Sequence, residues 1–148
     1  MPQLGGAAAL IAVARSAPSN AEVQASVAAA LRNLAIDENQ QCAIQEMGGI
    51  DVLMKAAHAL SSDTEVVAHV AAALWNLSRT PTVASEMAKI GAVELLVNAA
   101  TSHVANSLVQ TNVAGALRHL AVREEIAEKI VSAGGLPALL ASAAAHQV

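Results

Sequence analysis

The chain has 148 residues, of which 55% are hydrophobic and 1% aromatic, and its formal net charge is -4 at pH 7. Its apolar residues are mostly alanine, leucine and valine, which favour closely packed helices over strands and over a large ligand cavity. The scarcity of Lys and Arg argues against binding to nucleic acid or to an acidic membrane surface, because both need a dense basic face.

Two landmarks return every 43 residues along the chain. The first is a glycine, found at Gly5, Gly48, Gly91 and Gly134. The second is a segment of the form Leu-x-x-Leu, beginning at Leu31, Leu74 and Leu117. The landmarks divide one domain, residues 1–148, into repeats 5–47, 48–90 and 91–133 and a partial repeat 134–148. Such repeats stack, and the stack presents an extended surface.

Each repeat is predicted to contain three helices. In the second repeat, apolar residues at helical spacing mark a first helix over 50–60. Asp63 is then expected to cap a long helix with Glu65 in its first turn, as Asn20 and Glu22 do in the first repeat. A shorter helix follows and leads to the next glycine, which can adopt the backbone angles of a sharp turn. The three copies of this short helix contain Ile44, Met87 and Ile130.

Cys42 is the only cysteine, so no internal disulfide can form. This favours a reducing, intracellular compartment, either cytoplasmic or nuclear. Cys42 itself is expected to be a small core residue. The apolar stretch from Leu4 to Ala14 lacks a basic leading segment and already belongs to the repeat pattern, so it is not interpreted as a signal peptide. No apolar run reaches membrane-spanning length.

The glycine turn, the three helices and the motif Ala-Leu-x-Asn-Leu together resemble the armadillo repeat. The motif occupies residues 30–34 and 73–77, and the third copy departs from it at His119. The resemblance covers Gly5 to Val148 and implies a right-handed α-solenoid of three-helix repeats that serves as a protein-binding scaffold. It also implies that the third helices line a concave groove, where Asn33 and Asn76 would hydrogen-bond the backbone of an extended peptide. His119 would take the same place in the third repeat.

The chemistry of asparagine suits this role independently of the family. One carboxamide offers a donor and an acceptor, so it can bond both an N–H and a C=O of a bound main chain. The alternative is that these side chains cap a neighbouring helix or bond across the repeat interface. Helical geometry places further residues on the same face, four or seven positions before each Asn position. These specificity candidates are Ala29, Ala72 and Gly115, and Ser26, His69 and Asn112.

The small residues among these candidates would let a ligand backbone come close, although a packing role explains them equally well. Gly115 in mid-helix costs about 1 kcal/mol relative to Ala unless the space is used. The importin-alpha branch of the family carries Trp four positions before the Asn. Because no repeat of this chain has Trp there, basic nuclear-localisation peptides are not expected as ligands.

Trp75 stands one residue before Asn76, where the other repeats have Arg32 and Arg118. A position that holds Arg twice is expected to be accessible to solvent, so Trp75 is interpreted as partly exposed. An exposed Trp beside a binding Asn is typical of an interface hot spot. The alternative is that the indole packs across a repeat junction. The peptide-binding candidates therefore include Trp75, Arg32 and Arg118.

No catalytic or metal-binding pattern emerges. The histidines lack metal-ligand spacing with Cys or carboxylates, and the glycine pairs lack the Lys-Ser or Lys-Thr of a phosphate loop. The sequence therefore predicts a protein-interaction scaffold that is not an enzyme and needs no cofactor or metal. Two alternatives remain, a structural spacer within a longer solenoid and a regulatory or targeting domain of an enzyme outside this chain.

The two ends lack the polar outer faces that cap a solenoid. Leu136, Leu139 and Leu140 are expected to present apolar surface without a partner inside the chain. We therefore expect a piece of a longer array, or end-to-end self-association through the uncapped termini.

Overall fold

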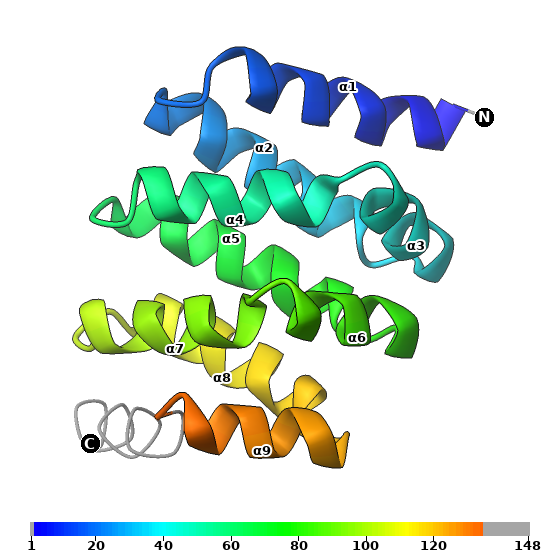
Figure 1. The fold of residues 1–148 in the computed structure, drawn as a ribbon. Coiled ribbons are helices and arrows are strands. Elements are labelled where there is room, and N and C mark those ends of the chain that lie inside the picture. Colours follow the sequence, from blue (N-terminus) through cyan, green and yellow to red (C-terminus); the bar gives the residue numbers. More distant parts are fainter. Residues whose placement is uncertain (1, 135–148) are drawn as a thin grey trace.

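The computed structural model describes residues 2–134, which form nine helices and no strand. The all-α prediction is confirmed for these residues. Figure 1 shows the helices stacked from α1 at one end to α9 at the other. The helices are α1 (Pro2–Ser16), α2 (Ala21–Leu34), α3 (Glu38–Glu46), α4 (Gly49–Ala59), α5 (Thr64–Leu77), α6 (Pro81–Lys89), α7 (Ala92–Ser102), α8 (Ser107–Leu120) and α9 (Glu124–Ser132).

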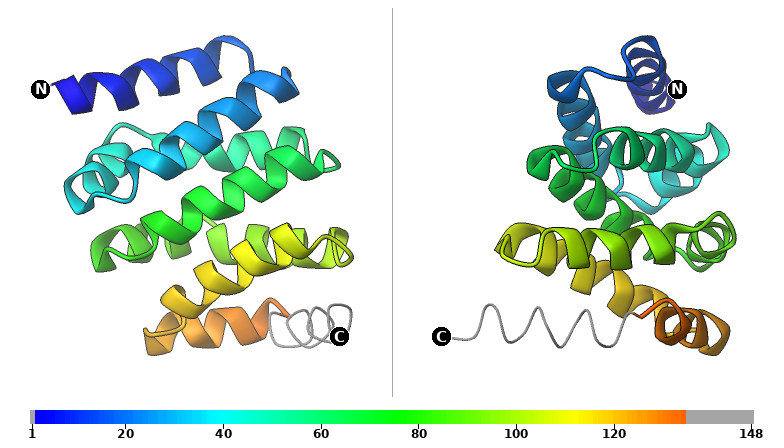
Figure 2. Two further views of the ribbon diagram at one scale, coloured as in Figure 1. Left: turned by 180° about the vertical axis from the view of Figure 1, so that it is seen from behind. Right: turned by 60° about the vertical axis from the view of Figure 1, so that its left-hand side comes forward.

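Three kinds of helix recur in the same order, although α1 has 15 residues and its equivalents α4 and α7 have 11 each. The long helices α2, α5 and α8 have 14 residues each, and α5 packs against both of the others. Seen from behind in Figure 2, these three lie side by side. Helices α1, α4 and α7 form a second layer, and the short helices α3, α6 and α9, of 9 residues each, lie at one edge. The layers place one face of every long helix outside the core.

The starts of the long helices are fixed by side chains that accept backbone N–H groups. Asn20 Oδ1 accepts from the Val23 N–H and Asp63 Oδ1 from the Val66 N–H, each at 3.0 Å. Both predicted caps are thus confirmed. Asn106 caps α8 in the same way. A cap of this kind satisfies an N–H that has no partner within its own helix.

The turn into the next repeat uses the left-handed conformation of glycine. Gly48 has φ 86°, Gly91 φ 94° and Gly134 φ 85°. The glycine-turn prediction is confirmed at these three positions. It is wrong at Gly5, because α1 begins at Pro2 and continues through Gly5 as helix.

The core is one continuous cluster that runs between the layers. Leu31, Leu74 and Leu117 of the repeated motif are almost completely inaccessible to solvent. Cys42 is half-buried and packs against the core, as its residue type predicts. Within residues 2–134, no helix combines the length and the apolar character needed to span a bilayer. The leucines that were expected to be unpartnered, Leu136, Leu139 and Leu140, lie outside the described residues.

Candidate peptide-binding surface

The outer faces of α2 and α5 carry five of the predicted site residues, which together we call the long-helix face. On α2, Ser26 and Asn33 are exposed and Ala29 is half-buried. On α5, His69 and Asn76 are half-buried. Residues three, four or seven positions apart share one side of a helix, so each set points the same way. The predicted grouping on a common helix face therefore holds for α2 and for α5.

Asn33 is the freest of these side chains. Its Oδ1 accepts a long hydrogen bond of 3.4 Å from Nε of Arg32. No other hydrogen bond joins its carboxamide to the described residues, so its amide nitrogen is available to an incoming acceptor. Because Asn33 is exposed, a ligand can reach it without displacing protein atoms.

Asn76 forms a bond between two repeats. Its Nδ2 donates to the carbonyl oxygen of Arg32 at 2.9 Å. That carbonyl belongs to the last turn of α2, where the helix itself supplies no partner. The carbonyls on either side, of Leu31 and Asn33, accept the N–H groups of Ala35 and Ile36. The bond across the repeat interface, which the sequence left open as an alternative, is therefore present.

This bond uses only half of the Asn76 carboxamide. A carbonyl oxygen can only accept, so the amide nitrogen must face Arg32. Asn76 Oδ1 has no partner among the described residues. Three described side-chain atoms are both inaccessible to solvent and without a hydrogen-bond partner, namely Gln40 Oε1, Trp75 Nε1 and Gln110 Oε1. Asn76 Oδ1 is not one of them, so solvent reaches it. The oxygen is thus oriented by the first bond and remains accessible to an N–H donor.

His119 occupies the equivalent position in the third repeat and is half-buried. Burial lowers the pKa of His119 below its ordinary value, and the positive charges of Arg118 and Arg79 lower it further. The imidazole is therefore neutral at pH 7. A neutral imidazole offers one donor and one acceptor, which is the same pair of functions that a carboxamide offers. The departure from Asn at this position keeps the hydrogen-bonding capacity.

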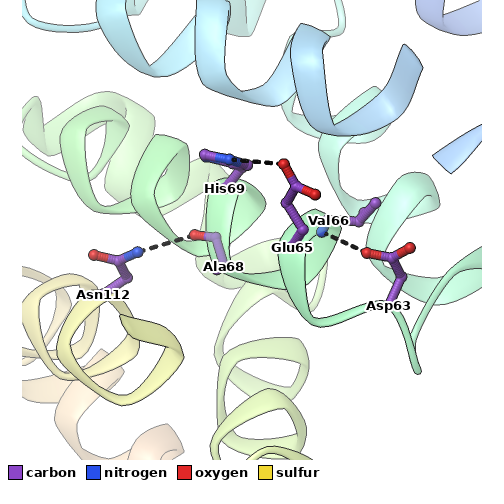
Figure 3. A network of polar contacts seen from close by, with 6 residues as sticks. All are labelled: Asp63, Glu65, Val66, Ala68, His69 and Asn112. Atoms are coloured by element: carbon purple, nitrogen blue, oxygen red, sulfur yellow. Dashed lines mark hydrogen bonds and ion pairs between the residues drawn. The ribbon is translucent and has the colours of Figure 1, made fainter. Parts of the chain in front are cut away.

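The position seven residues earlier differs from repeat to repeat. Ser26 is exposed, and His69 Nε2 lies 3.9 Å from Glu65 Oε1 on the same helix. Asn112 is only 7% exposed, and its Nδ2 donates to the carbonyl of Ala68 at 3.0 Å (Figure 3). Its side chain therefore joins α8 to α5. The expectation that Asn112 lies open to a ligand is not met, because the neighbouring helix covers it.

The position four residues before the Asn is largely closed after the first repeat. Ala72 is 5% exposed, and Gly115 is buried. A Cβ atom placed on Gly115 would lie 2.7 Å from Cζ2 of Trp75, so the indole fills the space that a side chain at this position would need. This contact explains why a glycine stands in mid-helix, although glycine has a lower helix propensity than alanine.

Trp75 is half-buried, and its ring contacts α8 at Gly115. Its Nε1 is sealed from solvent without a hydrogen-bond partner. The indole thus packs across the junction between repeats, which was the alternative to a freely exposed binding residue. At the equivalent positions Arg32 is half-buried and Arg118 is exposed, as expected for Arg.

Sequence reasoning missed a pair of glutamines that close the ends of helices. Gln24 Nε2 donates to the carbonyls of Ala14 and Ala17, and Gln110 Nε2 donates to those of Ala100 and His103, each at 2.9 Å. Both glutamines hold the same repeat position, and this recurrence in the sequence could have identified them. The second repeat has Val67 at that position, so the recurrence is not continuous.

Residues 37–79 match the family model of the Armadillo/beta-catenin-like repeat. The matched segment runs from the N-cap of α3 to just beyond α5, so the long helix is the third helix of the matched repeat. The resemblance noted in the sequence is thus confirmed for this segment. No curated protein and no solved structure matches the chain.

Proposed function

We propose that this chain is a non-catalytic module that binds other proteins, because residues 37–79 match the armadillo-repeat family model. Armadillo repeats generally mediate protein–protein interactions. The proposal includes a right-handed solenoid with a 43-residue period, in which repeats 5–47, 48–90 and 91–133 continue into 134–148. The family and the repeated order of helices support it.

The ligand in this proposal is an extended peptide that crosses the long helices along their outer faces. The observation that carries it is the accessible Oδ1 of Asn76, held in place by the bond from Nδ2 to Arg32. An acceptor fixed in this way binds an N–H without losing side-chain freedom on binding. The unpartnered amide nitrogen of Asn33 supplies a donor beside it. Together they offer a peptide main chain both kinds of hydrogen bond, whatever its sequence.

Charge selects among such peptides. The positions beside the Asn row carry Arg32 and Arg118, and Arg79 lies close enough to His119 to lower its pKa. The far ends of α2 and α5 carry the exposed acids Glu22 and Glu65. A peptide bound along the Asn row therefore passes the basic side of the face, so acidic side chains are favoured. This agrees with the expectation that basic nuclear-localisation peptides are not ligands.

An array of random peptides, each about ten residues long, tests the proposal with the whole chain as the probe. We expect the bound peptides to be rich in Asp and Glu. With the best of them, Asn33→Ala should weaken binding about fivefold, because a typical hydrogen bond contributes about 1 kcal/mol. Asn39→Ala, at an exposed Asn on α3, is the matched control and should bind normally. Unchanged binding by Asn33→Ala would contradict the assignment.

An array that retains no peptide would contradict the proposal as a whole. It would favour the interpretation of the chain as a structural spacer. The remaining alternative, a regulatory or targeting domain of an enzyme outside this chain, is compatible with peptide binding and is decided by the full-length reading frame.

A further inference from the structure

The layer of α1, α4 and α7 contains two crevices at equivalent places, one of them much larger than the other. The first crevice lies between the C-terminal halves of α1 and α4 and has a volume of about 560 Å³. The second crevice lies between α4 and α7 and has a volume of about 170 Å³. The C-terminal ends of α1, α4 and α7, which contribute lining residues, lie toward the left in Figure 1. The layer is separate from the long-helix face, which belongs to α2 and α5.

The linings of the two crevices share eight repeat positions, so each crevice is a natural reference for the other. Six of these positions hold different residues. The pairs are Arg15 and His58, Pro18 and Ser61, Gln24 and Val67, Val52 and Leu95, Lys55 and Asn98, and Ala59 and Ser102.

Two differences explain the smaller volume of the second crevice. Leu95 is larger by one methylene group than Val52, which faces the first crevice. His103 Nε2 lies 2.8 Å from the carbonyl oxygen of Ser61, and this contact joins the end of α7 to the turn after α4. No hydrogen bond or ion pair joins α1 to α4 among the described residues. The first crevice therefore stays open, at a volume typical of small-molecule sites.

The floor of the first crevice holds an unused acceptor. Gln24 is only 3% exposed, and its Nε2 is engaged by the carbonyls of Ala14 and Ala17. Its Oε1 has no partner and is not sealed from solvent, whereas Oε1 of Gln110, the equivalent residue two repeats on, is sealed. Because Gln24 lines the first crevice, its oxygen is open to that space. An N–H or O–H group inside the crevice can reach this oxygen.

The rim of the first crevice is basic although the chain as a whole is acidic. Arg15, Lys55 and His58 line it, and no carboxylate does. Lys55 pairs with the exposed Asp51, whereas no described carboxylate lies within ion-pair distance of Arg15. The Arg15 guanidinium lies beside Gly48, the N-cap of α4, where the helix dipole also favours negative charge. The second crevice has neither Arg nor Lys in its lining.

The C-terminal ends of α1 and α4 also lie at this crevice, and their partial negative charge opposes the positive charge of the rim. A helix C-terminus corresponds to roughly half a negative charge. At α1 this charge is partly offset, since Gln24 Nε2 donates to the carbonyls of Ala14 and Ala17. The full positive charge of Arg15 has no such partner. Positive charge therefore prevails near Arg15.

We propose that the first crevice is a binding site for a small amphiphilic anion. The apolar part of the ligand packs against Val52 and Ala56, and an N–H or O–H donates to Gln24 Oε1. A carboxylate, sulfonate or phosphate group lies near Arg15. This site is independent of the peptide-binding proposal, because it uses other residues, and Gln24 lies on the buried side of α2.

The probe that tests this site is 1-anilinonaphthalene-8-sulfonate, which combines an aromatic body, one N–H donor and one anionic group. Its uncharged counterpart, N-phenyl-1-naphthylamine, lacks only the sulfonate. We expect one saturable site for the sulfonate, followed by its fluorescence and by calorimetry. The uncharged compound should bind about tenfold more weakly, because the charge-assisted contact with Arg15 is missing. Equal affinity for the two compounds would overturn the charge assignment.

Substitutions that copy the second crevice locate the site. Val52→Leu should weaken binding of the sulfonate at least about tenfold, because the added methylene occupies the ligand space. Arg15→His should weaken the sulfonate and leave the uncharged compound unchanged. The matched controls are Val131→Leu and Arg123→His, outside the crevice, and both should bind normally. Since Leu95 occupies the position equivalent to Val52, the fold accommodates the larger side chain.

Circular dichroism and thermal unfolding establish that each variant is folded, because unfolded chains also bind this dye. A folded Val52→Leu variant with unchanged affinity would overturn the proposal. If Val52→Leu does not fold, the exposed Arg15→His variant decides the question on its own. Asn33→Ala on the long-helix face should leave dye binding unchanged, so a failure of either proposal is distinguishable from a failure of the other.

Discussion

Replacing Gly115 with Ala is expected to destabilise the chain, although Ala is the better helix former. The change gains about 1 kcal/mol of helix propensity. The new Cβ atom would lie 2.7 Å from Trp75 Cζ2, which is closer than side-chain atoms approach one another. Pushing the indole out of its place costs about 1 to 3 kcal/mol, the usual cost of overpacking. The cost of overpacking therefore exceeds the gain in helix propensity, and we expect the free energy of unfolding to fall by about 1 kcal/mol.

A double-mutant cycle with Trp75→Ala separates the two effects. In the Trp75→Ala background the indole is absent, so Gly115→Ala should stabilise the chain by about 1 kcal/mol, the propensity term alone. The same substitution is therefore expected to change sign between the two backgrounds. Urea unfolding followed by far-ultraviolet circular dichroism measures all four proteins, since two of them lack the only Trp.

A stabilising effect of Gly115→Ala in the wild-type background would refute this reasoning. It would mean that the indole does not occupy the space beside α8, and Trp75 would again be a candidate for a freely exposed binding residue. An equal destabilisation in both backgrounds would place the cost elsewhere in the packing around Gly115.

Three further predictions follow from single side chains. Asn76→Ala should lower the free energy of unfolding by about 1 kcal/mol, because the Arg32 carbonyl loses its partner, whereas Asn33→Ala should change it by less than about 0.5 kcal/mol in the same urea titration. The free energy of unfolding should fall as the pH drops below about 6.5, because the unfolded state binds a proton at His119 more readily than the folded state does. His119→Asn should make the free energy of unfolding less dependent on pH in this range. An unchanged dependence would exclude His119 as its source. Trp75 emission should lie at shorter wavelength than that of a hydrated indole, with weak iodide quenching, because Nε1 is sealed; strong quenching would contradict the packed position.

The elements of the fold were readable from local signals, whereas the contacts between repeats were not. Asn20 and Asp63 act on N–H groups three residues away, so the local sequence suffices to assign them as caps. Asn76 and Asn112 reach carbonyls in another repeat, and the choice of carbonyl depends on how neighbouring long helices are offset. No property of a single helix sets that offset. The position of a residue within the repeat therefore predicted which side chains lie outside the core, but it did not predict their hydrogen-bond partners.

The packing of Trp75 is a second contact between repeats that the sequence did not predict. Its equivalence to Arg32 and Arg118 suggested exposure, and both arginines are at least partly accessible. The indole differs because the next long helix has Gly115 where the other repeats have Ala29 and Ala72. A glycine in mid-helix was visible in the sequence as a missing side chain. Only the structure identifies the ring that takes its place.

The two crevices also have a mechanical meaning. At the second junction, His103 joins α7 to the turn after α4 and Asn112 joins α8 to α5, so both layers are fastened. At the first junction the long helices are fastened by Asn76, and no hydrogen bond or ion pair links α1 to α4 among residues 2–134. The bonds from Asn76 to Arg32 and from Thr80 to Gln41 therefore hold the first junction, whereas α1 and α4 meet through packing alone. The spacing of Asn33 and Asn76 thus depends on the long helices and not on the layer that holds the crevice.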